Sequence, residues 1–132
     1  ARAIKIALDD AGLTPQDIDY ICADGAVTID AETTETKAIK QVFEAHAKKI
    51  PVSAPKSVFG NMLGACGAVD VATTVLAMEH GMVPPTINYQ TPDPECDLDY
   101  CPNKAQTKTI KNALIINRGR GGINCALVLQ KP

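Results

Sequence analysis

The chain has 132 residues, of which 45% are hydrophobic and 21% charged, and its formal net charge is -2. This composition predicts one globular unit and excludes a disordered or fibrous chain. The sequence pI is near 5.6, and without a run of lysines and arginines the chain lacks the basic surface of nucleic-acid binders. No apolar stretch approaches the roughly 20 residues that a membrane span requires.

Five cysteines are spread along the chain, an odd number with no pair in a CxxC or Cys/His zinc spacing. This pattern predicts no metal site, and it favours a reduced, cytoplasmic protein whose thiols are mostly small buried groups. The chain opens with Ala1 and Arg2, without a start methionine or a signal sequence, so we expect it to begin inside a longer polypeptide. The cysteines are Cys22, Cys66, Cys96, Cys101 and Cys125.

The N-terminal segment predicts a helix followed by a strand. Apolar residues recur at helical spacing over residues 1–11, and Gly12 follows where a left-handed residue ends a helix. Thr14 and Pro15 are typical of a helix cap and first turn. A short turn should therefore lead into a strand over residues 18–23.

Two further helices are predicted in the middle of the chain. Residues 33–48 have one apolar and one charged face, which is the pattern of an amphipathic helix that lies on a sheet. A strand over 51–54 and a glycine-rich stretch then precede a helix over 68–78. Because that helix is apolar nearly all round, we expect both of its sides to be covered, one of them by sequence outside this chain.

The C-terminal part predicts a loop and two strands. The proline spacing over residues 82–103 indicates an extended, loop-like passage. Strands over 112–117 and 124–130 follow, and a glycine-rich stretch at 119–122 separates them. The order of the elements indicates an α/β fold in which a mixed β-sheet is layered between α-helices.

Four blocks of the sequence stand out: AGLTPQDIDYI (11–21), DGAVTIDAETTETKAIK (24–40), PKSVFGNMLGACGAVD (55–70), and VPPTINYQTPDPECDLDY (83–100) running on to NRGRGGINCALV (117–128). Together they resemble the C-terminal half of the β-ketoacyl synthases, which have the thiolase-like fold. The resemblance implies that residues 1–132 form a C-terminal β-ketoacyl synthase-like domain. It also implies that the N-terminal half, which carries the family's nucleophilic cysteine, is absent from this chain and is its first partner.

The positions that match the family's two catalytic histidines hold other residues. Where the family has a His-Gly-Thr motif this chain has DGA at 24–26, and Asn61 follows the KSVFG stretch that normally precedes the second histidine. The resemblance implies that neither Asp24 nor Asn61 performs imidazole chemistry. A carboxylate repels a developing enolate, and a carboxamide does not act as a general acid or base near neutral pH. We therefore predict no catalytic residue in this chain.

Other charged positions of the family are kept in some form. Lys56 matches the family's active-site lysine, Glu35 keeps its place, and Asp70 stands where the family usually has a glutamate. We interpret these three as a buried network that maintains the fold. The glycine loop at the family's pocket entrance has arginines in place of its two phenylalanines. This vestigial loop consists of Arg118, Gly119, Arg120, Gly121 and Gly122.

The replacements around Asp24 are mutually compensating in charge. A carboxylate in a partly buried pocket is costly unless it is paired, and arginines there carry the matching cost with the opposite sign. We therefore predict that Arg118, Arg120 or Lys56 places a side-chain nitrogen within about 4 Å of an Asp24 oxygen. Such a pair would close the pocket with a charged plug that keeps extender units out.

Loss of both histidines within a retained fold resembles the chain length factors of type II polyketide synthases. The resemblance implies a non-catalytic subunit of a β-ketoacyl synthase (acyltransferase) complex, which pairs with an active ketosynthase as a heterodimer. The pair would set polyketide chain length during decarboxylative condensation. Phosphopantetheine would arrive on an acyl carrier protein, so we expect no cofactor or metal in this chain, and neither a membrane nor a nucleic acid as partner.

Three other functions stay open at this point. The chain could belong to a purely structural pseudo-ketosynthase that stabilises its partner, or to an active β-ketoacyl synthase or thiolase with unusual catalytic residues. It could also be a binding module in which Arg118 and Arg120 grip the phosphate of phosphopantetheine, because a guanidinium recognises phosphate with two hydrogen bonds.

Overall fold

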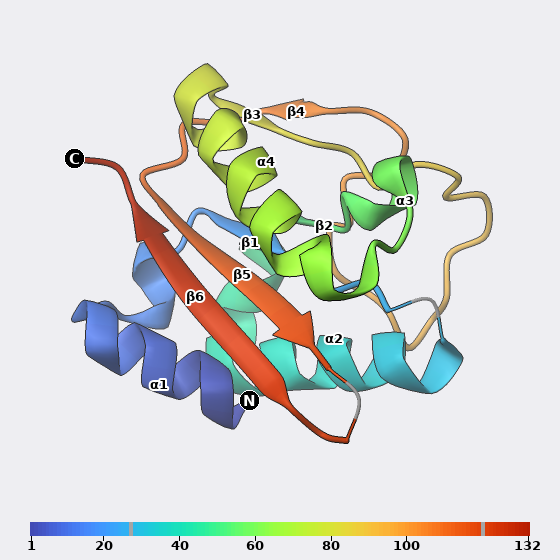
Figure 1. Cartoon of the computed structure of the whole chain (residues 1–132), viewed down its shortest axis with the longest axis horizontal. Helices are drawn as coiled ribbons and strands as arrows, with labels where there is room; N and C mark the ends of the chain where they lie inside the picture. Colours follow the sequence, from blue (N-terminus) through green and yellow to red (C-terminus); the bar gives the residue numbers. More distant parts are fainter. Residues whose placement is uncertain (27, 120) are drawn as a thin grey trace.

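The computed structural model describes residues 1–26, 28–119 and 121–132, which contain one four-stranded sheet between helices (Figure 1). Its strands are β1 (Tyr20–Cys22), β2 (Val52–Ser53), β5 (Asn112–Arg118) and β6 (Asn124–Gln130), in the order β2-β1-β5-β6. β1 lies parallel to both β2 and β5, whereas β6 is antiparallel to β5. The prediction of a mixed sheet is thus confirmed. A separate antiparallel pair joins β3 (Met82–Val83) to β4 (Gln106–Thr107), and β4 was not predicted.

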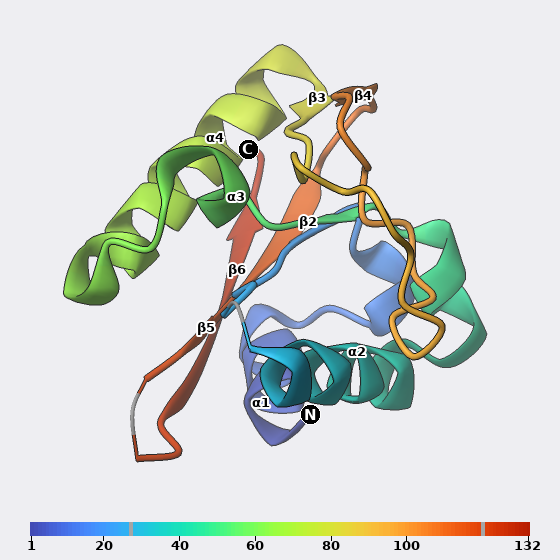
Figure 2. The ribbon, with the colours of Figure 1, turned by 90° about the vertical axis from the view of Figure 1, so that its right-hand side faces the viewer.

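The sheet lies between two layers of helix. Three long helices form these layers: α1 (Arg2–Ala11), α2 (Ile29–Phe43) and α4 (Cys66–His80). Figure 2 shows α1 and α2 on one face of the sheet and α4 on the other. Side chains alternate along the strands, so that Ile21 and Leu114 pack with the first pair of helices, while Tyr20 and Ile115 pack with α4. The buried runs of β1 and β5 are those of a parallel sheet that is covered on both faces.

The N-terminal elements follow their prediction. α1 ends where Gly12 takes a φ of 66°, the left-handed conformation that glycine adopts at helix ends. Thr14 and Asp17 form a capping box at the start of the short 3-10 helix η1 (Pro15–Asp17). The strand that follows, β1, is shorter than the predicted 18–23, because its pairing with β2 and β5 extends only over residues 20–22.

The second helix differs from its prediction at both ends. α2 starts before the predicted residue 33, because Thr28, in an extended conformation with φ of -129°, already serves as its N-cap. It stops before the predicted residue 48, because Glu44 takes a φ of 49°, outside the right-handed helical region. The chain continues to residue 49 as a 3-10 helix, η2 (Glu44–Lys49).

The fourth helix is covered on one side only. Two short helices, α3 (Lys56–Phe59) and η3 (Leu63–Ala65), lead into α4, which is longer than the predicted 68–78. Thr74 and Met78 are buried, but Val75 remains 47% exposed and Leu76 53%. No described element packs against the outer side, so the expected cover of that side by sequence outside this chain stays a prediction.

The predicted loop over 82–103 is extended and lies beside α2. Two surface ion pairs connect them: Lys40 Nζ lies 2.6 Å from Asp97 Oδ1, and Lys37 Nζ lies 3.3 Å from Glu95 Oε1. None of the helices that the structure describes is long and apolar enough to cross a membrane. The five thiols are free; three are buried, Cys96 is half-buried, and Cys125 is exposed on β6.

Candidate functional site: a buried charged network at the strand ends

The candidate site lies where the parallel strands end. β1, β2 and β5 run in the same direction, so their C-terminal ends meet at one edge of the sheet. Asp24 follows β1, Lys56 opens the helix after β2, and Arg118 is the last residue of β5. In open α/β sheets this edge is where ligand-binding crevices form. Sequence-distant charged residues are thereby brought together.

Lys56 is the central cation of the network. Its Nζ lies 2.6 Å from Asp70 Oδ2 and 3.5 Å from Asp24 Oδ1, and all three side chains are buried. Burial tends to lower the pKa of Lys56, but the hydrogen bond and charge of Asp70, with the charge of Asp24, raise it above its ordinary value. Lys56 is therefore held in its charged form. The predicted buried pairing of this lysine with an acid is confirmed.

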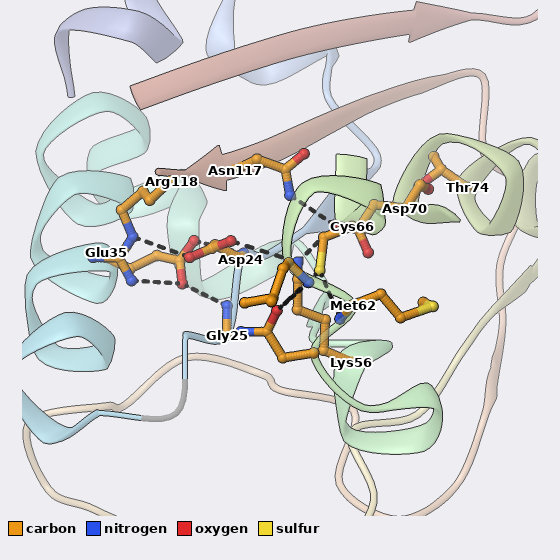
Figure 3. Close-up of polar contacts among 12 residues, drawn as sticks. Asp24, Gly25, Glu35, Lys56, Met62, Cys66, Asp70, Thr74, Asn117 and Arg118 are labelled. Atoms are coloured by element: carbon orange, nitrogen blue, oxygen red, sulfur yellow. Dashed lines mark hydrogen bonds and ion pairs between the residues drawn. The ribbon is translucent and has the colours of Figure 1, made fainter. Parts of the chain in front are cut away.

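Asp24 also pairs with a second cation. Its Oδ2 lies 3.4 Å from Arg118 Nε, and Arg118 Nη2 lies 3.7 Å from Glu35 Oε2. Figure 3 shows Asp24 between Arg118 and Lys56. The predicted contact within 4 Å of Asp24 is thus confirmed for both of these cations. Arg120 lies outside the described residues, so its share in the contact stays a prediction.

Glu35 fixes the backbone at the end of β1. Its carboxylate accepts hydrogen bonds from the N–H of Asp24 at 2.8 Å and from the N–H of Gly25 at 3.2 Å. Burial raises the pKa of Glu35, although these bonds and the charge of Arg118 oppose the shift. Gly25 has a φ of 53°, and a Cβ there would lie 2.6 Å from Ala54 Cβ, so a larger residue would not fit. The turn that places Asp24 therefore depends on glycine.

Asn117 belongs to the network, although the sequence analysis did not single it out. Its Nδ2 donates to Asp70 Oδ2 at 2.7 Å, beside the bond from Lys56. Asn117 and Arg118 are consecutive on β5, so their side chains point to opposite faces of the sheet. Asn117 meets the α4 layer and Arg118 meets the α2 layer. The signal that could have identified Asn117 is its place directly before Arg118 at the end of the predicted strand, where side chains alternate between the two faces.

Asn61 makes its contacts elsewhere. It is exposed, and its Oδ1 accepts from the N–H of Leu63 at 2.9 Å and from Cys66 Sγ at 3.2 Å. Nothing in the described part of the chain joins Asn61 to Asp24. The vestigial loop is exposed at Gly119, Gly121 and Gly122, and among its described residues Arg118 enters the network. A common pocket for Asn61 and Asp24 therefore stays a prediction.

The network is suited to holding charge in place rather than to exchanging protons. It contains three carboxylates, two cations and a carboxamide, but neither of the chain's two histidines. His46 lies in η2 and His80 at the exposed end of α4. Among the described residues, no group of three or more His, Cys, Asp or Glu side chains could hold a metal ion.

Comparison with known proteins identifies the family. Residues 1–90 match the family described as "Beta-ketoacyl synthase, C-terminal domain". This match covers more than half of the chain, and the chain therefore belongs to that family.

Relatives with assigned names come from polyketide and acyl-carrier-protein-dependent synthases. The chain is 47% identical to the putative polyketide beta-ketoacyl synthase 1 of Streptomyces cyaneus, over 100% of this chain and 31% of that protein. It is 46% identical, with the same coverage, to the tetracenomycin polyketide synthase ketoacyl synthase alpha subunit of Streptomyces glaucescens. It is 45% identical to 3-oxoacyl-[acyl-carrier-protein] synthase 2 of Synechocystis sp., over 98% of this chain and 31% of that protein. The chain thus spans about a third of the length of these relatives.

Solved structures agree with this assignment. A type II PKS acyl-carrier protein in complex with its ketosynthase, bound to the hexaketide, has a chain that matches 99% of this one with a TM-score of 0.97 and 41% identity. The ishigamide ketosynthase/chain length factor matches 99% with a TM-score of 0.94 and 37% identity. This chain covers 32% of each of those chains. The fold is therefore that of the C-terminal domain of a thiolase-like ketosynthase, of the kind found in type II polyketide synthases.

Proposed function

We propose that this chain is the C-terminal part of a chain length factor, a non-catalytic ketosynthase-like subunit. The subunit pairs with an active ketosynthase and helps to set polyketide chain length during decarboxylative condensation on acyl carrier protein. The observation that carries the proposal is Asp24. It stands where the family has its first catalytic histidine, and it is buried between Lys56 and Arg118.

The chemistry of these replacements supports a non-catalytic role. A group that assists decarboxylation stabilises an enolate, whereas the Asp24 carboxylate repels one. Lys56 and Arg118 do not reverse that repulsion, because these two cations are shared among three carboxylates, those of Asp24, Asp70 and Glu35. Asn61, at the second histidine position, is a carboxamide engaged with Leu63 and Cys66, and a carboxamide cannot act as a general acid or base near neutral pH.

A second candidate is an active ketosynthase with altered residues. What favours it is that several relatives at 45–47% identity are named beta-ketoacyl synthase 1 or ketoacyl synthase alpha subunit. Against it stand Asp24 and Asn61. A third candidate is a pseudo-ketosynthase that only stabilises its partner, which differs from a chain length factor in having no effect on the product.

The proposed partners follow from the same family assignment. They are the N-terminal part of the ketosynthase fold, a catalytic ketosynthase subunit and an acyl carrier protein, all in the cytoplasm. Solved structures similar to this chain include a ketosynthase with its acyl-carrier protein and ketosynthase/chain length factor assemblies, which supports this set. We propose that the phosphopantetheine arm of the carrier protein supplies the only prosthetic group.

The test is a reconstitution with the complete polypeptide, meaning this chain together with all sequence that flanks it in its gene. It is combined with an active ketosynthase, acyl carrier protein and malonyl units, and products are sized by mass spectrometry. We expect no product without the active ketosynthase, and a change in chain length when this subunit replaces another chain length factor. Product formed by this polypeptide alone would establish the active ketosynthase. Product of unchanged length would favour the structural pseudo-ketosynthase.

The matched variant is Asp24→His with Asn61→His in the complete polypeptide. We expect it to remain inactive without a partner. Arg118 still lies beside position 24 in this variant, and it no longer has the Asp24 carboxylate to pair with. Condensation by this double variant alone would contradict the proposal that the pocket as a whole has lost its function.

A further inference from the structure

A small pocket lies between α2 and the extended segment over residues 86–100. Figure 2 shows this segment, in yellow to orange, running down beside α2, where the ion pairs of Lys37 with Glu95 and of Lys40 with Asp97 fasten it. The pocket between them has a volume of about 170 Å³. Pockets for drug-sized ligands measure about 300–1,000 Å³. This one therefore suits a molecule of only a few heavy atoms.

Two tyrosine rings line the pocket on the side of the extended segment. The rings of Tyr89 and Tyr100 are stacked, with centroids 6.4 Å apart and planes at 25° to each other. The hydroxyls of Tyr100 and Thr36 share a hydrogen bond of 2.5 Å, which ties the second ring to α2. Ala23 and Ile39, both buried, add apolar surface. The interior thus consists largely of aromatic and aliphatic groups.

The backbone holds Tyr89 in a fixed place. The N–H of Tyr89 donates to Asn103 Oδ1 at 3.0 Å, and Asn103 Nδ2 donates to the carbonyl of Tyr89 at 2.7 Å. Asn88, directly before this tyrosine, has a φ of 62°, and Asn103 has a φ of 60°, a left-handed conformation that asparagine tolerates better than most residues. The ring is therefore positioned before any ligand arrives, which lowers the entropic cost of binding.

The charged groups of the pocket are all negative. The carboxylates of Glu32, Glu35 and Asp93 line it, and none of the described lining residues is a Lys, Arg or His. Glu35 is buried and pairs with Arg118, but among the ion pairs between described residues none involves Glu32 or Asp93, which are exposed. A malonate or a phosphate would be repelled here, whereas a cation would be attracted.

An alkylated ammonium group matches both the apolar interior and the negative charge. The face of a tyrosine ring carries negative charge density and attracts cations, and aromatic pockets that recognise quaternary ammonium groups use this attraction. The alkyl groups of such a cation can contact the rings, while its charge stays close to the carboxylates. A strongly hydrated metal ion fits less well, because removing its water against aromatic rings is costly.

We propose that this pocket binds a small organic cation, an alkylated ammonium compound whose alkyl groups contact Tyr89 and Tyr100 and whose charge is balanced by Glu32 and Asp93. The proposal goes beyond the proposed function and does not depend on it, because neither Asp24 nor Asn61 lines the pocket. It assigns to the chain a ligand site that is separate from the former catalytic positions.

The test uses two probes of the same shape. Choline and the alcohol in which a carbon atom replaces its nitrogen are titrated into the complete polypeptide, and binding is followed by ligand-observed NMR at constant ionic strength. We expect choline to bind with a Kd of about 1 mM and the uncharged alcohol to bind about tenfold more weakly. The difference between the two probes measures recognition of the charge alone.

Variants locate the binding in this pocket. Glu32→Gln with Asp93→Asn removes two exposed charges at nearly constant shape, so we expect an intact fold and choline binding weakened about fivefold or more, with the alcohol unaffected. Tyr89→Leu keeps apolar bulk but removes the ring face, and should weaken choline about threefold or more. The matched control is Glu79→Gln, an exposed change on α4 across the sheet, which should leave both affinities unchanged.

Three results would overturn the proposal. Equal affinity for choline and the alcohol would mean that the pocket does not recognise charge. Unchanged choline affinity in the Glu32 and Asp93 double variant would place the binding elsewhere. Absence of saturable choline binding would mean that the pocket is no ligand site in the complete polypeptide. None of these measurements involves a polyketide product, so their outcome is independent of the reconstitution that tests the proposed function.

Discussion

The two faces of the central sheet differ in how completely this chain covers them. On one face, α1 and α2 bury a continuous apolar core that includes Ile4, Phe43 and Leu114. On the other face, α4 buries Tyr20 and Ile115 beneath it, but its own outer side leaves Val75 and Leu76 about half exposed. The first face is complete by itself. The second has a layer whose far side still needs a neighbour, which agrees with a chain that spans about a third of its relatives.

The charged network lies where these two faces meet. Asp70 and Asn117 belong to the α4 side, Glu35 to the α2 side, and Asp24 and Lys56 connect them at the strand ends. Apolar packing and charge pairing therefore differ in how far this chain completes them. The outer side of α4 is left without cover by the described residues, whereas the ion pairs of the site are already formed within this chain.

The largest effect should come from producing the 132 residues alone. Large exposed apolar patches are rarely tolerated by soluble monomers, and the outer side of α4 would be one of them. We expect the isolated chain to elute as heterogeneous assemblies without a cooperative melt, when it is studied by size exclusion and calorimetry. A monodisperse monomer with one sharp transition would mean that the outer side of α4 needs no cover.

Removing the central cation should cost nearly as much in the complete polypeptide. Lys56→Met leaves Asp70 and Asp24 buried without their shared partner, and we expect a loss of about 3–5 kcal/mol in the free energy of unfolding. Lys37→Met is the control, because Lys37 pairs with Glu95 on the surface and exposed pairs contribute little. Urea titrations of both variants give the comparison. A similar small loss for both would show that the buried pairs do not stabilise the site.

Truncation of exposed apolar residues can test the difference between the faces directly. Leu76 on α4 and Ile6 on α1 are exposed to a similar degree, 53% and 56%. In the complete polypeptide we expect Leu76→Ala to cost about 2–3 kcal/mol, as for a buried leucine, and Ile6→Ala to stay within about 0.5 kcal/mol. Thermal or urea unfolding measures both. Equal costs would remove the distinction between a face that is complete and one that awaits cover.

The smallest predicted effect is a dependence of stability on pH through Glu35. Burial raises the pKa of Glu35 above its ordinary value of 4.5, so the folded protein binds this proton more tightly than the unfolded chain does. The stability that this contributes is fully present below pH 4.5 and is lost as the pH rises through the raised pKa. We expect the fall in melting temperature across that window to flatten in Glu35→Gln but not in Glu32→Gln, an exposed change on the same helix. An unaltered slope in Glu35→Gln would assign the pH dependence to other groups.

Much of the fold could be predicted from the sequence because the signals are local. Helical spacing followed by Gly12 gave α1 and its end, and the glycine-separated apolar runs gave β5 and β6. The pairing of Asp24 with Arg118 and Lys56 could also be predicted, although these three residues are far apart in sequence. Burial makes an unpaired charge so costly that two opposite charges at neighbouring family positions were expected to meet.

Only the tertiary structure decided the remaining features, because none of them follows from a local sequence pattern. The end of α2 depends on the conformation of Glu44, the role of Asn117 on the position of Asp70 beside β5, and the one-sided burial of α4 on which elements of this chain reach it. Periodicity fixed which residues of α4 are apolar, but not which of them this chain covers. That is set by the three-dimensional arrangement of the layers, which no local pattern contains.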